Sequence, residues 1–192
     1  MADITELQGK LDSALGALKE LQSAPGLYEL ACKTKIGISK LWAGAGGSAL
    51  FHRVWLPPWA LGDNCSLYEL TWRLAHELTH VKQGILFFGS LDTEREAYIV
   101  QCRVQAELLK RQRPVPRQEL ARVEAGLRAL QGGSASAKFW ILRQGPYYAN
   151  FPDTQPRLWQ VNKWWPQVAY AVRTARGHGP ATKPGPKLKR KA

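Results

Sequence analysis

Residues 66–84, SLYELTWRLAHELTHVKQG, form the stretch that decides how this chain is organised. Apolar residues recur in it at three- and four-residue spacing, which is typical of the buried stripe of an amphipathic helix. The stripe consists of Leu67, Leu70, Leu74, Leu78 and Val81. Ser66 has the character of a helix N-cap, Glu69 follows it at the capping-box spacing, and Gly84 stands where a helix of this length ends. The segment therefore predicts a helix that runs to about Gln83.

The same helix carries the pattern H-E-x-x-H at residues 76–80. Histidines four residues apart project from one face of a helix, so the imidazoles of His76 and His80 can both bind one zinc ion. Glu77 lies beside the first histidine and is predicted to be the general base that takes a proton from a zinc-activated water. The alternative is that both histidines are solvated or hydrogen-bonded residues of a surface helix.

A catalytic zinc site needs a third protein ligand and one open position. The next predicted helix covers about residues 90–112, and an antiparallel pair of helices would bring Glu94 close to His80. Glu96 is the second candidate for this ligand. Acidic residues are also favoured at a helix N-terminus by the helix dipole alone. The third histidine of a metzincin is absent, since Leu86 occupies its position.

The pattern H-E-L-T-H-V-x-Q at residues 76–83, followed by E-x-E-A at residues 94–97, resembles the gluzincin branch of the zincin metallopeptidases. It is most similar to small bacterial domains with this signature, and the resemblance covers about residues 48–108. It implies that Glu94 is the third zinc ligand. The aspartate that orients a ligating histidine in that family falls on Tyr98, which is a departure from the pattern.

The resemblance also implies a strand before the motif helix, whose edge pairs with an extended substrate. Residues 48–57, SALFHRVWLP, alternate like a half-buried strand and stand in the right place. His52 on this strand is either a substrate contact or a structural residue. A later tyrosine or histidine donates a hydrogen bond to the developing negative charge in the family. Tyr147 and Tyr148 are predicted for this role, with loop packing as their alternative, and His178 is a further source.

The remaining patterns predict a mostly helical α+β fold, a zincin-like core with a small sheet packed on the motif helix. Helices are expected over residues 4–23, 27–33, 90–112, 117–131, 135–143 and 157–173. The glycine-rich residues 42–47 are expected to form a turn. We predict one domain over residues 1–175 and a disordered basic tail over residues 176–192, which are rich in Pro, Gly and Lys.

More than half of the net charge of +12 lies near the end of the chain, where Arg173 to Ala192 contain seven Lys or Arg and no acidic residue. The tail is expected to be solvated or to bind an anionic partner, such as nucleic acid or an anionic membrane surface. The three cysteines form no C-x-x-C pair, which excludes a cysteine-rich zinc site. We see no signal peptide and no membrane span, so a cytoplasmic location is expected and non-classical export stays open.

The expected function is that of a zinc metallopeptidase that hydrolyses peptide bonds of a peptide or protein substrate. Two alternatives belong to different functional classes. In the first, the chain is a non-catalytic zinc-binding interaction module. In the second, it is a basic nucleic-acid-binding protein that acts through its C-terminal tail.

Overall fold

The computed structural model describes residues 4–38, 46–48, 52–60, 62, 64–84, 89–145, 148–149 and 151–154. Within these residues the protein has the predicted α+β fold and is mostly helical. The helices are α1 (Ile4–Lys19), α2 (Leu27–Ala31), α3 (Leu67–Lys82), α4 (Leu91–Arg111), α5 (Arg117–Gln131), α6 (Ser134–Leu142) and the short 3-10 helix η1 (Pro58–Ala60). The strands are β1 (Lys35–Ile38), β2 (Gly46–Ser48) and β3 (Arg53–Leu56). The helix predicted over residues 157–173 and the tail predicted over residues 176–192 lie outside the described residues.

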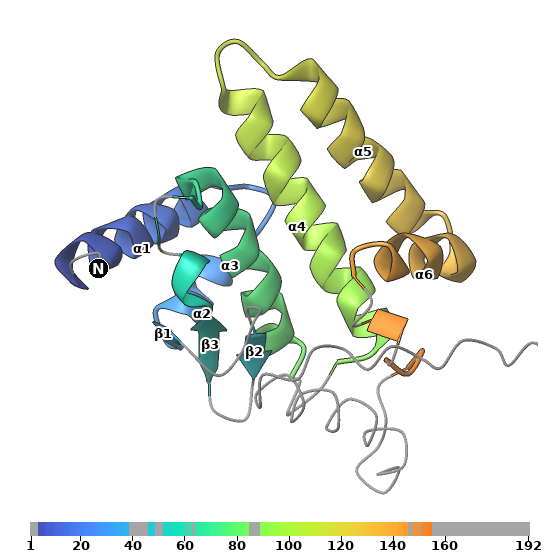
Figure 1. Ribbon diagram of the computed structural model, residues 1–192, viewed down its shortest axis with the longest axis horizontal. Coiled ribbons are helices and arrows are strands. Elements are labelled where there is room, and N and C mark those ends of the chain that lie inside the picture. The colour runs from blue at the N-terminus through green and yellow to red at the C-terminus, as the bar shows by residue number, and fades with distance from the viewer. Residues whose placement is uncertain are drawn as a thin grey trace, which may run out of the picture.

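Helix α3 is the centre of the fold and lies between α1 and α4, next to the small sheet (Figure 1). The Ser66 hydroxyl caps its first turn by accepting a hydrogen bond of 3.1 Å from the Glu69 N–H. The Glu69 carboxylate does not complete the predicted capping box, because it accepts two hydrogen bonds from the Arg73 guanidinium instead. Gly84 follows the helix in the left-handed conformation, with φ of 75°, which a glycine adopts without strain.

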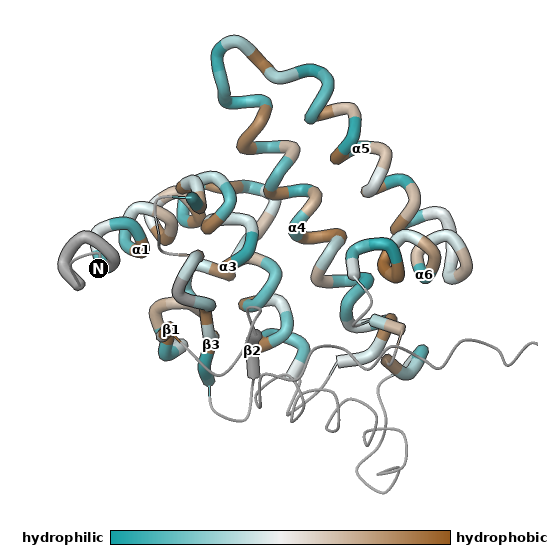
Figure 2. The backbone as a smooth tube through the Cα atoms, in the orientation of Figure 1, coloured by the Kyte–Doolittle hydropathy of each residue, from teal (hydrophilic) through white to brown (hydrophobic). Residues whose placement is uncertain are grey.

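Two hydrophobic clusters meet at the junction of α3 and α4. The first fills the space between α1, α2, the sheet and α3, and its fully buried side chains include Leu18, Leu56, Leu70, Leu74 and Leu78. The second joins α4, α5 and α6 to the segment 151–154 and includes Leu91, Tyr98, Leu130, Ile141 and Phe151. Figure 2 shows that the loop end of the α4–α5 hairpin, which points away from α3, is mostly hydrophilic. The apolar contacts therefore hold α4 against α3 through Val104 and the neighbouring Val100 and Leu108, while Leu91 and Tyr98 pack α4 against α5 and α6.

The sheet corrects the predicted strand over residues 48–57. Strand β3 is central, pairing in parallel with β1 and antiparallel with β2. Because β2 and β3 are antiparallel, the chain reverses between Ser48 and Arg53, and His52 belongs to that turn, with φ of 42°. Residues 48–57 contain no Gly, Asn or Asp to mark a turn, so the sequence pattern did not reveal the reversal.

The strand order also contradicts the prediction that the strand directly before the motif helix pairs with substrate through its edge. Both edges of β3 are occupied, so β3 cannot add an extended peptide. Within the described part of the sheet, the free edges belong to β1 and β2. Strand β2 begins at Gly46, inside the segment that was expected to be a turn, and that prediction is wrong for Gly46 and Gly47.

The N-terminal helix is shorter than predicted, since α1 ends at Lys19 and not at residue 23. The N–H groups of Glu20 and Leu21 bond to carbonyls only three residues back, which tightens and ends the helix. The leucine spacing continues to Leu21 because this side chain still packs in the first cluster after the turn. The buried Leu21 therefore continues the leucine spacing of the sequence beyond Lys19, where the helix ends.

Candidate metal centre

Helix α3 carries three buried polar side chains on the face that meets α4. His76, Glu77 and His80 are each between 6% and 7% exposed, in a helix whose other face is packed leucine. The Nε2 atoms of His76 and His80 point to the same place and lie 3.1 Å apart. Imidazoles on successive turns converge in this way only when both rings are directed by packing, because each is free to rotate on an exposed helix.

Helix α4 brings Glu94 to the same point from the second helix. The Ser90 hydroxyl accepts from the Thr93 N–H and the Thr93 hydroxyl accepts from the Ser90 N–H, a reciprocal capping box. The N–H groups of Leu91 and Asp92 donate to the carbonyls of Pro152 and Asp153, which fixes the start of α4 further. Glu94 lies in the first turn of this anchored helix, and its carboxylate is buried.

The three side chains fit a metal ion. Glu94 Oε1 lies 3.3 Å from His80 Nε2, and Glu94 Oε2 lies 3.4 Å from His76 Nε2. A tetrahedral ion with bonds of about 2.0–2.1 Å has ligand atoms about 3.3–3.4 Å apart. Each histidine nitrogen lies at such a distance from one of the two Glu94 oxygens, and one ligand atom from each of the three residues lies within 4.8 Å of the others. Glu94 Oε2 is a buried oxygen without a hydrogen-bond partner among the described residues. This buried group could hold a metal ion.

The pKa shifts of His80 and Glu94 indicate that the cluster holds a proton at neutral pH when no metal is bound. Burial opposes a charge on His80, but the Glu94 carboxylate outweighs it and raises the pKa of His80 to about 9. Burial also opposes a charge on Glu94, but His80 and His76 lower the pKa of Glu94 to about 2. A metal ion that binds here has to displace a proton from His80 at neutral pH.

Glu77 lies outside the ligand cluster but within its electric field. Burial raises the pKa of Glu77, while His76 and His80 oppose that rise and Glu94 adds to it. A carboxylate with a raised pKa is a better proton acceptor than an exposed one. The structure thus puts next to the cluster a carboxylate with the properties of a general base.

Glu96, the second candidate for the third ligand, is not part of the cluster. Its side chain is exposed, and its Oε2 accepts a hydrogen bond of 2.9 Å from Gln83 Nε2. The Oε1 of the same Gln83 amide lies 3.0 Å from His80 Nδ1. Glu96 therefore reaches the histidine only through Gln83, a residue to which the sequence patterns gave no role.

Tyr98 stands at the position of the family's aspartate and contacts His76 with its ring. The ring centroids of His76 and Tyr98 are 4.6 Å apart in an edge arrangement. His76 Nδ1 is buried and has no hydrogen-bond partner among the described residues. The His76 ring is therefore held by packing against the Tyr98 ring. Tyr98 in turn packs edge-on against Trp140, with ring centroids 5.1 Å apart.

Tyr148 reaches the site through Tyr98. Their hydroxyl oxygens lie 2.8 Å apart, so one hydroxyl donates to the other. Burial, with the charge of Glu94 in support, raises the pKa of both phenols, which keeps them protonated and able to donate near neutral pH. Tyr147 and His178 lie outside the described residues, and His52 is exposed in the turn before β3, where its carbonyl accepts from the Lys35 N–H.

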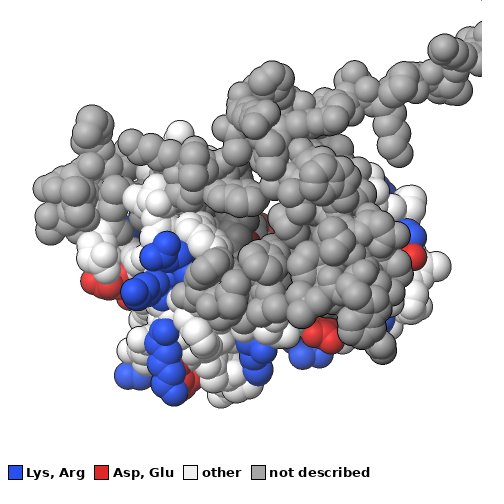
Figure 3. Space-filling view, turned by 90° about the horizontal axis from the view of Figure 1, so that it is seen from below, with Lys and Arg blue, Asp and Glu red and all other residues white. Residues whose placement is uncertain are grey.

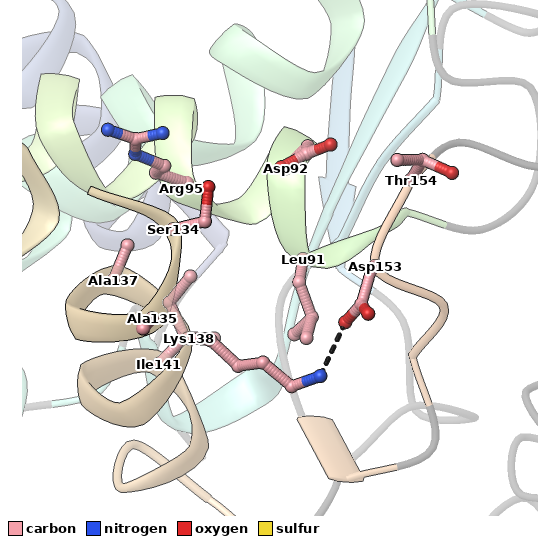
Figure 4. A pocket seen from close by; sticks show the side chains of 10 residues that line it. All are labelled: Leu91, Asp92, Arg95, Ser134, Ala135, Ala137, Lys138, Ile141, Asp153 and Thr154. Carbon is pink, nitrogen blue, oxygen red and sulfur yellow. Dashed lines mark hydrogen bonds and ion pairs between the residues drawn. The ribbon is translucent and has the colours of Figure 1, made fainter.

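A cavity of about 250 Å³ lies beside the first turn of α4, and none of the predicted site residues lines it (Figure 4). Three of its charged side chains, those of Lys138, Asp153 and Arg95, are held by one another or by the backbone. Lys138 bonds Asp153 at 2.7 Å, and Arg95 Nε donates to the Leu130 carbonyl. The cavity is thus separate from the His76, His80 and Glu94 cluster.

Gly89 is a second residue that the sequence patterns missed. A Cβ atom at this position would lie 3.1 Å from Glu94 Oε1 and 3.3 Å from the Phe151 ring. We expect Gly89→Ala to push the Glu94 carboxylate away from His80 and to lower zinc affinity roughly 10-fold, the lower range for disturbed ligand support. Competition with a chromophoric chelator measures this affinity. Gly145→Ala is the control, since its Cβ would meet no atom within 4 Å, and equal affinities of the two variants would contradict the prediction.

The described part of the chain thus offers two histidines and a carboxylate for a metal, a neighbouring carboxylate for proton transfer, and two phenols for hydrogen bonding. None of the described helices is both long and apolar enough to cross a membrane. Comparison with known proteins adds no family: no family model, no curated protein and no solved structure matches this chain.

Proposed function

We propose that this protein is a zinc-dependent metallopeptidase whose metal is bound by His76, His80 and Glu94. The observation that carries the proposal is the convergence of these three buried groups at ligand distances, with Glu77 beside them. Three protein ligands leave a fourth position open, which is typical of catalytic zinc and not of structural zinc. Peptide substrates and a zincin-like core follow from the resemblance of the H-E-x-x-H and E-x-E-A patterns to the gluzincins.

Zinc bound at this cluster supplies Lewis acidity, which polarises a substrate carbonyl and makes water more acidic. Glu77 accepts the proton of the attacking water at its carboxylate and delivers it to the leaving amine. Its buried position favours both steps, because the raised pKa makes the carboxylate a stronger base and its protonated form a usable acid. Proton transfer by a positioned carboxylate contributes about 10²–10⁴-fold to the rate.

Tyr148 is proposed to donate a hydrogen bond to the oxygen on which negative charge develops. The hydroxyl oxygens of Tyr98 and Tyr148 lie 2.8 Å apart, and a phenol that stays protonated near neutral pH is a hydrogen-bond donor. A single donor of this kind contributes about 10²–10³-fold in other hydrolases. Tyr148 is predicted to make this contact, with Tyr98 holding its hydroxyl in place.

Metal dependence of proteolysis tests the proposal. The purified full chain is expected to contain about one zinc ion by mass spectrometry and to cleave an unfolded substrate such as casein. Dialysis against a chelator should abolish cleavage, and zinc should restore it. Chelator-treated protein to which magnesium is added is the control, because a hard, octahedral ion does not suit two imidazoles. Cleavage that persists without metal would refute the proposal.

The second candidate is a zinc-binding module without catalysis. The surroundings of the His76 outer nitrogen favour it. Its Nδ1 atom lacks a described partner, and a tyrosine replaces the family's aspartate. This candidate predicts stoichiometric zinc and no cleavage. The nucleic-acid alternative depends on the C-terminal tail, which lies outside the described residues; on the face in Figure 3, the described Lys and Arg side chains lie in several separate groups with acidic side chains among them.

A further inference from the structure

The Gln83 side chain, at the C-terminal end of α3, has a hydrogen-bond partner for each of its polar atoms. Gln83 Nε2 donates to the Thr93 carbonyl and to Glu96 Oε2, both at 2.9 Å. Gln83 Oε1 lies 3.0 Å from His80 Nδ1. An amide nitrogen has two hydrogens, and these two acceptors use both. The amide can therefore face the histidine only with its oxygen.

This orientation fixes the tautomer of His80. A carbonyl oxygen only accepts, so His80 Nδ1 has to carry the hydrogen in the bond to Gln83. With Nδ1 protonated, the lone pair of neutral His80 lies on Nε2, the atom that faces His76 and Glu94. Gln83 thus selects the form of His80 that can bind a metal through Nε2.

The same amide joins the two helices that supply the ligands. Gln83 is the C-cap residue of α3, three positions after His80, and its acceptors Thr93 and Glu96 flank Glu94 in the first turn of α4. A shift of α4 along α3 that moved Glu94 away from His80 would also stretch both bonds. The bonds therefore hold Glu94 at the distance that a shared ion needs.

In the described part of the structure, His76 lacks the hydrogen bond to its outer nitrogen that Gln83 gives to His80. Its Nδ1 has no hydrogen-bond partner among the described residues, and its ring is held by edge contacts with His80 and Tyr98 at 4.7 and 4.6 Å. Hydrogen bonding of the outer nitrogen is the usual way in which a protein orients a ligating histidine. Within the described structure, that kind of support is given to His80 alone.

We propose that Gln83 is a positioning residue of the metal centre, which sets the Nδ1–H tautomer of His80 and fixes Glu94 against it. The proposal rests on the proposed metal-binding function. It assigns Gln83 no contact with substrate. Its effect is expected in metal affinity and in the geometry of the bound ion.

Replacing Gln83 by methionine tests the proposal, because methionine keeps the length of the side chain and removes its hydrogen bonds. We expect Gln83→Met to lower zinc affinity 10–100-fold, the usual effect of losing a ligand's outer partner. The visible spectrum of the cobalt-substituted protein should change as well, since the ligand field depends on imidazole orientation. Gln144→Met is the matched control, because the Gln144 amide donates to the Trp140 carbonyl on exposed α6.

Exchanging the amide of Gln83 and the carboxylate of Glu96 distinguishes a positioning role of Gln83 from a general loss of protein stability. In Gln83→Glu the carboxylate still accepts from His80, but it faces Glu96 and has no hydrogen for it, so zinc affinity should fall. Adding Glu96→Gln supplies an amide that donates to the new carboxylate and should recover most of the affinity. Glu96→Gln alone should bind zinc like the wild type, because an amide oxygen also accepts from Gln83.

Unchanged zinc affinity and an unchanged cobalt spectrum in Gln83→Met would overturn the role of Gln83 and leave the proposed function intact. Failure of Glu96→Gln to rescue Gln83→Glu, when both fold as judged by circular dichroism, would also overturn it. A wild-type chain that binds no zinc would overturn both proposals. The two failures are thus distinguished by the wild-type measurement.

Discussion

Replacing Glu77 by glutamine is expected to reduce peptide hydrolysis about 10²–10⁴-fold while zinc stays bound, because the amide cannot accept a proton. The ligand cluster consists of His76, His80 and Glu94, so the metal does not depend on Glu77. The two side chains have the same shape, which leaves the packing of this buried position unchanged. The comparison requires kcat/KM on one peptide substrate and zinc content from the same preparations.

The control for this prediction is Glu96→Gln, which removes a carboxylate near the site but outside the cluster. This variant should keep both zinc and activity. Full activity of Glu77→Gln would show that another group moves the proton. Loss of zinc from Glu77→Gln would show instead that Glu77 serves the metal or its support.

Replacing Glu94 by glutamine is expected to remove most of the stabilisation that zinc gives the wild-type protein. Zinc at 100 times its Kd stabilises a protein by about 2.7 kcal/mol, and a chain of this size gains roughly 2–4 °C of Tm per kcal/mol. We therefore expect the wild-type Tm to rise roughly 5–10 °C with zinc, and the Tm of Glu94→Gln to rise much less. Thermal unfolding followed by circular dichroism, with and without zinc, measures both shifts.

The wild type and Glu94→Gln are also expected to differ in stability without metal, and this difference depends on pH. The pKa of Glu94 is lowered to about 2, so its contribution is complete above the unfolded value near 4.5 and is lost as the pH falls towards 2. The pKa of His80 is raised to about 9, so its contribution is complete below the unfolded value near 6.5 and is lost as the pH rises through 9. The pair thus stabilises the metal-free protein most between about pH 4.5 and 6.5.

Glu96→Gln again serves as the control, and here it decides between the two carboxylates that the sequence left open. A zinc-induced Tm shift that survives in Glu94→Gln and disappears in Glu96→Gln would reverse the assignment of the third ligand. Equal shifts in the wild type and both variants would place the ion outside this cluster. Zinc is added after the metal-free Tm is known, so the two effects of Glu94 are measured separately.

Local sequence signals were sufficient for most of the helical fold. The bounds of α5 agree with the predicted residues 117–131, and the predicted ends of α3 and α4 agree within a residue or two. These ends are marked by residues whose effect is local: Ser66 and Ser90 as N-caps, and Gly84 in the left-handed conformation. Capping and apolar spacing act within a few residues, and a single sequence displays them directly.

The sequence was less informative about the sheet. The central place of β3 depends on its pairing with β1, which lies 15 or more residues away, and the chain reversal between Ser48 and Arg53 depends on the pairing of β3 with β2. Alternation predicts an extended segment but not its partners or its edges. The strand predicted to bind substrate at its edge is for this reason the one with both edges occupied.

By itself, the sequence determined that His76, Glu77 and His80 share one helix, because their spacing and the helical repeat are properties of a single segment. Only the tertiary structure brought Glu94, and not Glu96, to the two histidines, because residues two positions apart face different sides of α4. It also gave Gln83 its three hydrogen bonds and Gly89 its place against the Glu94 carboxylate. These contacts form between α3 and α4, and the packing of two separate segments fixes distances that neither segment encodes alone.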